Sequence, residues 1–377
     1  MLIIDWTRQA LPAMLDDLRA VVELETHSYD KAMLVKGLRM IRARAVDLLG
    51  TPDEEVLHDG GQFGDILELT YQGTMPGTVL MLSHYDTVWP TGTLAGWPFA
   101  VVEDKVTGPG VFDMKAGLVQ SIWALRGLRE LGLPHPSVRF LFNGDEEIGS
   151  PASREHIEAA SSDVLASLVF EASLDGALKT ARKGVGLFNV RVTGVEAHAG
   201  LDPYAGASAI HALAEIVTTL AGAASRDRGT TVNVGLISGG TARNVAAGRA
   251  NCGVDVRVTD PSEMARVDDL FADLRASDPR VTISVTGEWN RPPMIPNPAS
   301  ERLFKEAQEV AAEFGWLLDE ASVGGASDGN FISALGRPVL DGMGAVGDGA
   351  HARHEHVLID QIPVRTALTI GLLTALA

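Results

Sequence analysis

The sequence contains a single cysteine and far fewer basic than acidic residues, and both shortages exclude classes of protein. Its 377 residues include 31 Lys and Arg against 49 Asp and Glu, which gives a formal net charge of −18. Nucleic acids and anionic membrane surfaces are bound through clustered basic charge, so we expect neither as a partner. The lone Cys252 excludes an intrachain disulfide and a thiolate-rich metal cage, and it is typical of a reducing compartment.

Long apolar segments are missing as well. No stretch approaches the length of a membrane span, and the N-terminal sequence MLIIDWTRQALPAML has neither the basic region nor the cleavage site of a signal peptide. Hydrophobic residues nevertheless make up 46% of the chain, enough to fill a large core. We therefore expect a cytoplasmic globular protein, and at this length two domains rather than one.

Apolar patterns predict an α/β fold for the first part of the chain. Residues 16–49 have the spacing of two helices, with Ser28 as a candidate cap of the second. A further helix is predicted over residues 114–131. Short, nearly all-apolar strands are predicted over residues 77–83, 138–143 and 167–170. Such strands are typical of a largely parallel sheet that is covered on both faces.

The middle of the chain has a different pattern. Strands and helices alternate there in the order β-α-β-β-α-β, which is typical of a ferredoxin-like domain. The proline-rich segment 291–298 follows, and the helices and strand after it resemble a return to the first domain. We predict a mostly parallel-sheet domain built from residues 1–181 and 290–377, interrupted by a ferredoxin-like domain over residues 182–289.

Chemically active side chains stand at the predicted strand ends. His84 and Asp86 follow the first strand, the acidic run 145–147 follows the second, and Glu171 follows the third. Taken singly, each has a plainer interpretation, such as a solvated acidic loop. Because the carboxyl ends of parallel strands meet at one edge of a sheet, we expect these side chains to converge.

Two further residues complete the predicted cluster. Asp113 lies in a glycine-rich turn just before a helix, where it could equally be a helix cap, and His351 lies in the return segment. Carboxylates and imidazoles without thiolates suit a hydrolytic zinc site, with cobalt or manganese as substitutes. A carboxylate that bridges two metals about 3.5 Å apart would let them polarise a carbonyl and activate water together.

With these residues in place, the sequence resembles a known family. The matching motifs are SHYDTV (83–88), GPGVFDMKAG (108–117), NGDEEIGS (143–150), VFEAS (169–173), EAHAG (196–200), SGGTARN (238–244), GGASDGN (324–330) and GAHARHE (349–355). In order and spacing they are similar to those of the two-zinc aminoacylase/carboxypeptidase/deacetylase metallopeptidases. The branch that they resemble is that of the glutamate carboxypeptidases (carboxypeptidase G), and the resemblance covers nearly the whole chain.

The resemblance implies a set of metal ligands. One zinc would be held by His84 and Glu171, the other by Glu147 and His351, and Asp113 would bridge the two. His351, rather than the nearby His354 or His356, stands at the family's interval before a glutamate, Glu355.

The resemblance also implies the residues that support catalysis. Glu146 would be the general base, Asp86 would orient His84, and the Asp113–Met114 peptide bond would be cis. The motif GGASDGN is similar to active-site backbone, but Ser327 and Asp328 receive no role.

The inserted domain resembles the lid through which relatives form dimers. His198 and Asn244 match residues that reach the active site of a neighbouring subunit, so we expect a homodimer. Arg257 and Arg291 match arginines that hold the free carboxylate of the substrate. The plainer alternatives are a surface turn at His198 and surface ion pairs at the arginines.

These observations predict a metallohydrolase. It would cleave the amide bond between an acyl or peptidyl group and a C-terminal amino acid, preferably glutamate or aspartate. An N-acyl-amino-acid deacylase or dipeptidase is the alternative within the family. A non-catalytic protein that binds amino-acid derivatives is the alternative outside it, and loss of a ligand or of Glu146 would favour that alternative, but all are present.

Overall fold

The computed structural model describes residues 2–377, which form two compact units. Unit 1 comprises the chain up to Ala181 together with Pro296–Val323 and Ser327–Ala377. Unit 2 comprises Arg182–Ile295 and the short segment Gly324–Ala326. Each unit has its own buried apolar core.

Unit 1 is built on a six-stranded mixed sheet. Its strands, in spatial order, are β1 (Glu54–His58), β2 (Ile66–Tyr71), β6 (Ser137–Asn143), β3 (Thr78–His84), β7 (Ala166–Val169) and β14 (Val339–Leu340). The four strands from β6 to β14 are mutually parallel, whereas β1 and β2 are joined antiparallel to their neighbours. The central strands β3, β6 and β7 are buried on both faces, as their apolar sequences predict. The predicted α/β class with a mostly parallel sheet is confirmed.

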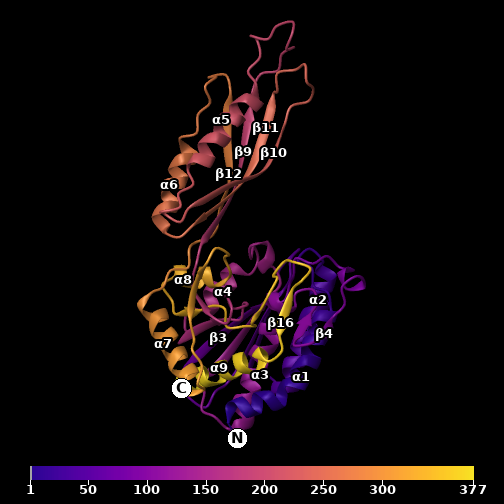
Figure 1. Cartoon of the computed structure of the whole chain (residues 1–377), viewed down its shortest axis with the longest axis vertical. Coiled ribbons are helices and arrows are strands. Elements are labelled where there is room, and N and C mark those ends of the chain that lie inside the picture. The colour runs from indigo at the N-terminus through magenta and orange to yellow at the C-terminus, as the bar shows by residue number, and fades with distance from the viewer. Residues whose placement is uncertain (1) are drawn as a thin grey trace. The chain divides into compact units, whose positions relative to one another are not determined.

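The helices of unit 1 are α1 (Ile3–Glu23), α2 (Lys31–Leu49), α3 (Ala116–Leu131), α4 (Arg154–Ala160), α7 (Pro298–Glu313), α8 (Gly329–Ala334) and α9 (Gln361–Ala375). Among them α1, α3 and α9 pack against one another (Figure 1). The predicted cap of α2 is wrong. Asp30 is the N-cap and accepts a hydrogen bond from the Met33 N–H, whereas the Ser28 hydroxyl donates to Asp86.

Two smaller sheets complete unit 1. In one, the order is β15 (Gly347–Asp348), β16 (His356–Leu358), β5 (Lys105–Thr107) and β4 (Ala100–Val102). In the other, β8 (Leu178–Arg182) pairs with β13 (Glu320–Val323). The pairing of β16 with β5 matters for the site, because it places the loop that carries His351 beside the loop that leads to Asp113.

Unit 2 has a four-stranded antiparallel sheet with two helices on one face (Figure 1). Along the chain its elements are β9 (Gly184–Thr193), α5 (Ala209–Gly222), β10 (Thr231–Gly239), β11 (Arg249–Val258), α6 (Pro261–Ala272) and β12 (Thr282–Arg291). The predicted β-α-β-β-α-β order is therefore confirmed. Alternate residues of β9 and β11 are buried under the helices, and the intervening ones lie on the open face of the sheet.

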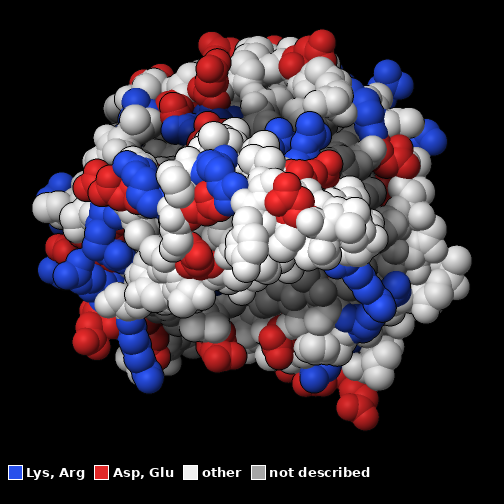
Figure 2. Space-filling model, turned by 90° about the horizontal axis from the view of Figure 1, so that it is seen from above, with Lys and Arg blue, Asp and Glu red and all other residues white. Residues whose placement is uncertain are grey.

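The surface carries charged side chains of both signs, which the sequence contains in quantity (Figure 2). On the face drawn in Figure 2, Lys and Arg side chains are interspersed with Asp and Glu side chains. None of the helices within residues 2–377 combines the length and apolar character that crossing a membrane requires.

Candidate metal centre and active site

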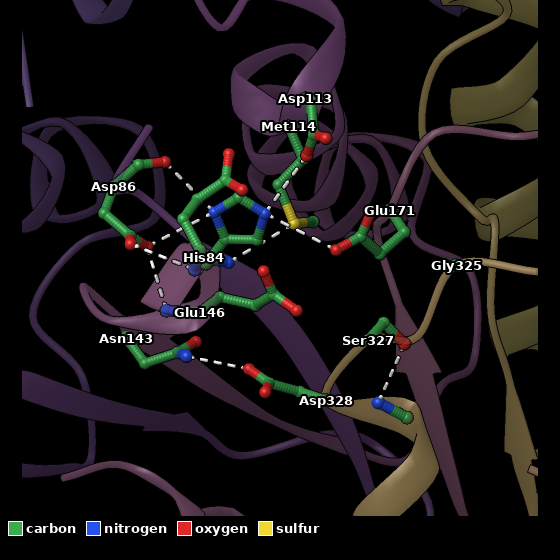
Figure 3. A network of polar contacts seen from close by, with 12 residues as sticks. His84, Asp86, Asp113, Met114, Asn143, Glu146, Glu171, Gly325, Ser327 and Asp328 are labelled. Carbon is green, nitrogen blue, oxygen red and sulfur yellow. Dashed lines mark hydrogen bonds and ion pairs between the residues drawn. The ribbon is translucent and has the colours of Figure 1, made fainter. Parts of the chain in front are cut away.

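The end of strand β3 brings the first histidine into the site. His84 pairs in parallel register with Asn143 of β6, and β7 lies on the other side of β3. Because Glu171 follows β7, its carboxylate reaches the same edge of the sheet. The distance between His84 Nε2 and Glu171 Oε1 is 3.4 Å, and both side chains are buried (Figure 3). The convergence that the strand ends predict is therefore present in the structure.

Asp113 lies between two histidines. Its Oδ1 is 3.2 Å from His84 Nε2 and its Oδ2 is 3.4 Å from His351 Nε2. Glu147 Oε2 lies 3.0 Å from the same nitrogen of His351. The Asp113–Met114 bond is cis, as the resemblance implied. The structure thus brings the five predicted ligands together, with one carboxylate facing both histidines.

Asp86 organises more of the site than the sequence predicts. The Nδ1 atom of His84 lies 3.1 Å from the carbonyl oxygen of Asp86 and 3.4 Å from its Oδ1. One carboxylate oxygen also accepts the backbone N–H of Glu146 at 3.2 Å (Figure 3). The other accepts the backbone N–H of Glu147, also at 3.2 Å. A fourth contact comes from the Ser28 hydroxyl, at 2.8 Å. One buried carboxylate therefore fixes both the first histidine and the turn that carries the predicted base.

Electrostatics in this cluster favour bound positive charge. Burial raises the pKa of Glu147 to about 7, and the charge of Asp113 adds to the increase. Hydrogen bonds to Asp113 and Glu147 raise the pKa of His351 to about 11. Burial alone would lower the pKa of His84, but its contacts with Asp113, Asp86 and Glu171 raise it overall. The carboxylates together thus stabilise cations at this point.

The donor set fits divalent metal ions. Carboxylate oxygens and imidazole nitrogens are suitable ligands for zinc, cobalt and manganese. Two groups of side chains present such atoms within 4.8 Å of one another: His84 with Glu146 and Glu171, and His84 with Asp113 and Glu147. In addition, Glu147 Oε1 is buried without a hydrogen-bond partner among the described residues. A cation would satisfy this oxygen, which otherwise is costly to bury.

Glu355 is a residue whose structural role the sequence does not predict. It is fully buried, and its Oε1 accepts the N–H groups of Phe112 (2.8 Å) and Asp113 (3.1 Å). Its Oε2 accepts the N–H of Gly110 (2.9 Å) and the indole N–H of Trp89 (3.0 Å). Glu355 thereby ties the loop of His351 to the loop of Asp113. The only signal in the sequence is its interval after His351.

The two predicted lid residues lie near each other in unit 2. The Ala199 N–H donates to the Asn244 carbonyl oxygen at 2.9 Å, and His198 forms a β-bridge with Val245. His198 is exposed, and its Nδ1 accepts the N–H groups of Gly200 and Leu201 at 3.1 Å. The Nδ1 nitrogen of His198 is therefore engaged within its own loop.

The two predicted substrate arginines also belong to unit 2. Arg257 is half-buried, donates to both carboxylate oxygens of Asp255 at 3.1 Å, and donates to the Gly324 carbonyl at 3.2 Å. This arrangement is the ion pair that the plainer interpretation expects. Arg291 ends β12, is buried, and donates to the Asn290 side chain at 2.8 Å.

Comparison with known sequences gives a consistent result. Residues 80–375 match the model of Peptidase family M20/M25/M40. The chain is 28% identical over 375 residues to carboxypeptidase G2 of Pseudomonas sp. (strain RS-16), covering 96% of this chain and 89% of that protein. It is 27% identical over 322 residues to succinyl-diaminopimelate desuccinylase of Dechloromonas aromatica (strain RCB), covering 79% of this chain and 83% of that protein.

Among solved structures, the fold is similar to that of the YXEP protein of Bacillus subtilis, described as a dinuclear metal-binding peptidase from the M20 family. The TM-score is 0.70 at 17% sequence identity, and the match covers 97% of this chain and 98% of that one. At this identity the similarity establishes a shared fold.

Proposed function

The chain belongs to Peptidase family M20/M25/M40 and is a metallohydrolase, and we propose that it removes a C-terminal amino acid, glutamate or aspartate, from an N-acyl or short peptide substrate. The proposal includes two zinc ions per subunit as cofactors. Cobalt and manganese are possible substitutes, because they accept the same oxygen and nitrogen ligands.

One observation carries the proposal: a carboxylate, Asp113, faces two histidines that each have a second acidic neighbour. His84 has Glu171 at 3.4 Å, and His351 has Glu147 at 3.0 Å. This is the arrangement that a bridged pair of metal ions requires. The similarity to a peptidase described as dinuclear supports the same conclusion.

The mechanism follows from the residues around this cluster. Bound here, divalent cations would polarise the scissile carbonyl and lower the pKa of water. Glu146 would accept the proton of the attacking water and deliver it to the leaving nitrogen. Asp86 holds the N–H groups of Glu146 and Glu147, so the base and its neighbouring ligand keep a fixed spacing. Such fixed positioning contributes much of the rate acceleration in enzymes.

The preference for an acidic C-terminal residue is supported by the similarity to carboxypeptidase G2. We propose that Arg257 and Arg291 bind the free carboxylate of the substrate, since a guanidinium fork matches a carboxylate. His198 and Asn244 would complete the site of a neighbouring subunit in a homodimer.

The similarity to a succinyl-diaminopimelate desuccinylase favours a second candidate. In this alternative the enzyme is an N-acyl-amino-acid deacylase that recognises the acyl group more strictly than the released amino acid.

Hydrolysis of a matched substrate panel distinguishes the two. The purified protein with added zinc is assayed on the N-acetyl, N-benzoyl and N-succinyl derivatives of glutamate, aspartate, alanine, leucine and arginine. For the proposed function, kcat/KM depends mainly on the amino acid and is largest for glutamate or aspartate. The Glu146→Gln variant, which keeps the shape of the side chain but cannot act as a base, is the control for contaminating hydrolases.

Two outcomes would contradict the proposal. A rate that depends on the acyl group and hardly on the amino acid would favour the deacylase. Equal rates for the wild-type protein and Glu146→Gln would show that the measured hydrolysis does not use Glu146 as its base.

A further inference from the structure

The turn that carries Glu146 and Glu147 must be held in one conformation, and its two ends are contacted by the same side chain. The turn begins at Asn143, the last residue of β6, and ends near Ser150. Asn143 Nδ2 donates to Asp328 Oδ2 at 2.8 Å (Figure 3). The Ser150 hydroxyl donates to Asp328 Oδ1. One carboxylate from the C-terminal part of the chain thus joins both ends of the turn.

The position of Asp328 in the sequence suggests a different role, which the structure does not show. Asp328 is the N-cap residue of α8, and aspartate is a preferred N-cap because its oxygen accepts an N–H of the first helical turn. No such side-chain bond forms here. The side chain faces the turn of Glu146 instead, so a helix-capping role does not explain the aspartate.

Burial makes these contacts strong. Asp328 is 2% exposed, and Asn143 and Ser150 are fully buried. A buried carboxylate needs hydrogen bonds from its surroundings, and bonds to a charged group are stronger than those between neutral groups. Removal of the carboxylate would leave buried donors without this acceptor, which is the costly way to break a hydrogen bond.

Within the turn, further bonds transmit this constraint. The Ser150 N–H donates to the Asp145 carbonyl at 2.8 Å, and Ser150 has a left-handed backbone with φ of 58°. Asn143 Nδ2 also contacts Ser153 Oγ at 3.2 Å, and that hydroxyl donates to Asp145 at 2.6 Å. Asp145 directly precedes Glu146. A displacement of Asn143 or Ser150 would therefore shift Asp145 and, with it, the adjacent base Glu146.

We propose that Asp328 is a positioning residue, which holds the turn from Asn143 to Ser150 so that Glu146 and Glu147 keep their geometry at the metal cluster. The inference rests on the proposed function for its catalytic consequence, though not for the structural contact itself. Asp328 acts through Asn143 and Ser150.

Hydrogen exchange of the metal-free protein tests the structural part directly. Exchange of the backbone amides in a peptide covering residues 143–150 is compared between wild type, Asp328→Ala and Asp328→Asn. We expect faster exchange in Asp328→Ala, with no change in the strands of unit 2 as an internal reference. Asparagine can accept from Asn143 and donate to Ser150 Oγ, so Asp328→Asn should restore slow exchange.

Kinetics at saturating zinc test the catalytic part. We expect Asp328→Ala to lower kcat by a factor on the order of 10–10², because small misplacement of a reacting group has effects of that size. KM should change little, and Asp328→Asn should recover most of kcat. The matched control is Asp17→Ala, which removes another buried carboxylate of unit 1 that accepts from Trp123 at 2.8 Å. It should lower thermal stability without lowering kcat.

A double mutant tests whether Asp328 acts on the turn through Ser150. If Asp328 acts partly through Ser150, the loss of activation free energy, calculated from kcat, should not be additive. The loss in Asp328→Ala/Ser150→Ala should be smaller than the sum of the losses in the two single variants. If Asp328→Ala does not fold, Ser150→Ala alone should still accelerate exchange in residues 143–150.

Three results would overturn the inference or separate it from the proposed function. Unchanged exchange in Asp328→Ala and Ser150→Ala would show that the turn does not depend on this contact. Faster exchange with unchanged kcat would give Asp328 a purely structural role. If the wild-type protein hydrolyses no substrate, the proposed function fails, while the exchange experiment still decides whether Asp328 holds the turn.

Discussion

The two units differ in what their sheets bury. In unit 1 the central strands β3, β6 and β7 are buried on both faces. β3 ends in His84, β6 ends in Asn143, and Glu171 follows the end of β7 by two residues. In unit 2 the strands alternate between a face buried under α5 and α6 and an open face. The double cover of unit 1 excludes water from the strand ends, so ionisable groups there interact strongly.

The candidate functional residues follow the same division. In unit 1, His84, Asp86 and Glu355 are buried and hydrogen-bonded to parts of the chain far away in sequence. In unit 2, His198 and Asn244 are exposed; the His198 ring accepts from N–H groups of its own loop, and the Asn244 carbonyl accepts the N–H of Ala199. We therefore expect substitutions in unit 1 to act within one subunit and those in the lid loops to act through assembly.

Metal removal should have the largest effect and should concern unit 1. After chelation, amide hydrolysis should be lost completely and should return on addition of zinc, because the proposed ligands Asp113, Glu147 and Glu171 then lack cations. The midpoint of thermal unfolding should also fall, since binding to the folded state stabilises it. The shift of this midpoint should be smaller in the fluorescence of Trp289, the only tryptophan of unit 2, than in the fluorescence of the tryptophans of unit 1. Full activity in a metal-free preparation would contradict the metal site.

His198→Ala should have the next largest effect and tests the assembly directly. In the proposed dimer His198 would donate to the oxyanion that develops during hydrolysis, and loss of such a donor lowers kcat by about 10²–10³-fold. When this variant is mixed with Glu146→Ala under conditions of subunit exchange, activity should return, because the mixed dimer combines an intact base with an intact His198. Exchange itself is followed by a tag on one variant. If exchange occurs and activity stays low, His198 does not act across the dimer.

Glu355→Gln should have an intermediate effect. The carboxylate accepts four N–H groups, and an amide has only one accepting oxygen, so two donors lose their partner. Loss of such bonds costs about 1–3 kcal/mol of unfolding free energy. Because Asp113 is one of the donors, zinc affinity should fall as well. Trp89→Phe removes only the indole donor and should have a smaller effect on both, which calorimetry and zinc titration can measure.

Sequence patterns predicted the elements that follow local rules. The apolar runs located β3, β6 and β7, and their ends indicated His84 and Glu171, because side-chain positions at the end of a parallel strand follow from the register. In the middle of the chain, the predicted order of strands and helices, β-α-β-β-α-β, matches the elements of unit 2.

Other features could not be predicted, because they depend on contacts between distant residues. Ser28 has the residue type of a helix cap, yet it donates to Asp86, 58 positions away. Glu355 accepts from Gly110, 245 positions away, where the glycine has a positive φ of 72°. No periodicity encodes which loop presents a free N–H to a buried carboxylate. Such partners emerge only when the chain has folded.

The smallest effect should arise in unit 2 and should depend on pH. Glu263 of α6 contacts Arg266 at 2.6 Å, and this hydrogen bond lowers the pKa of Glu263 to about 2. A carboxyl group whose pKa is lower in the folded state stabilises that state above its ordinary pKa, and the contribution disappears as the pH falls toward 2.

Glu263→Gln should therefore lower the melting temperature of unit 2, which is measured by the fluorescence of Trp289. Above about pH 5 this decrease should be constant, and below about pH 5 it should become smaller as the pH falls. The matched control is Arg266→Gln, which removes the partner and should show the same pH dependence. If the difference between wild type and Glu263→Gln is instead the same at all pH values, the contribution of Glu263 is one of packing and not of charge. In that case charged contacts would add to the stability of unit 1 and not to that of unit 2, beyond the apolar core that each unit has.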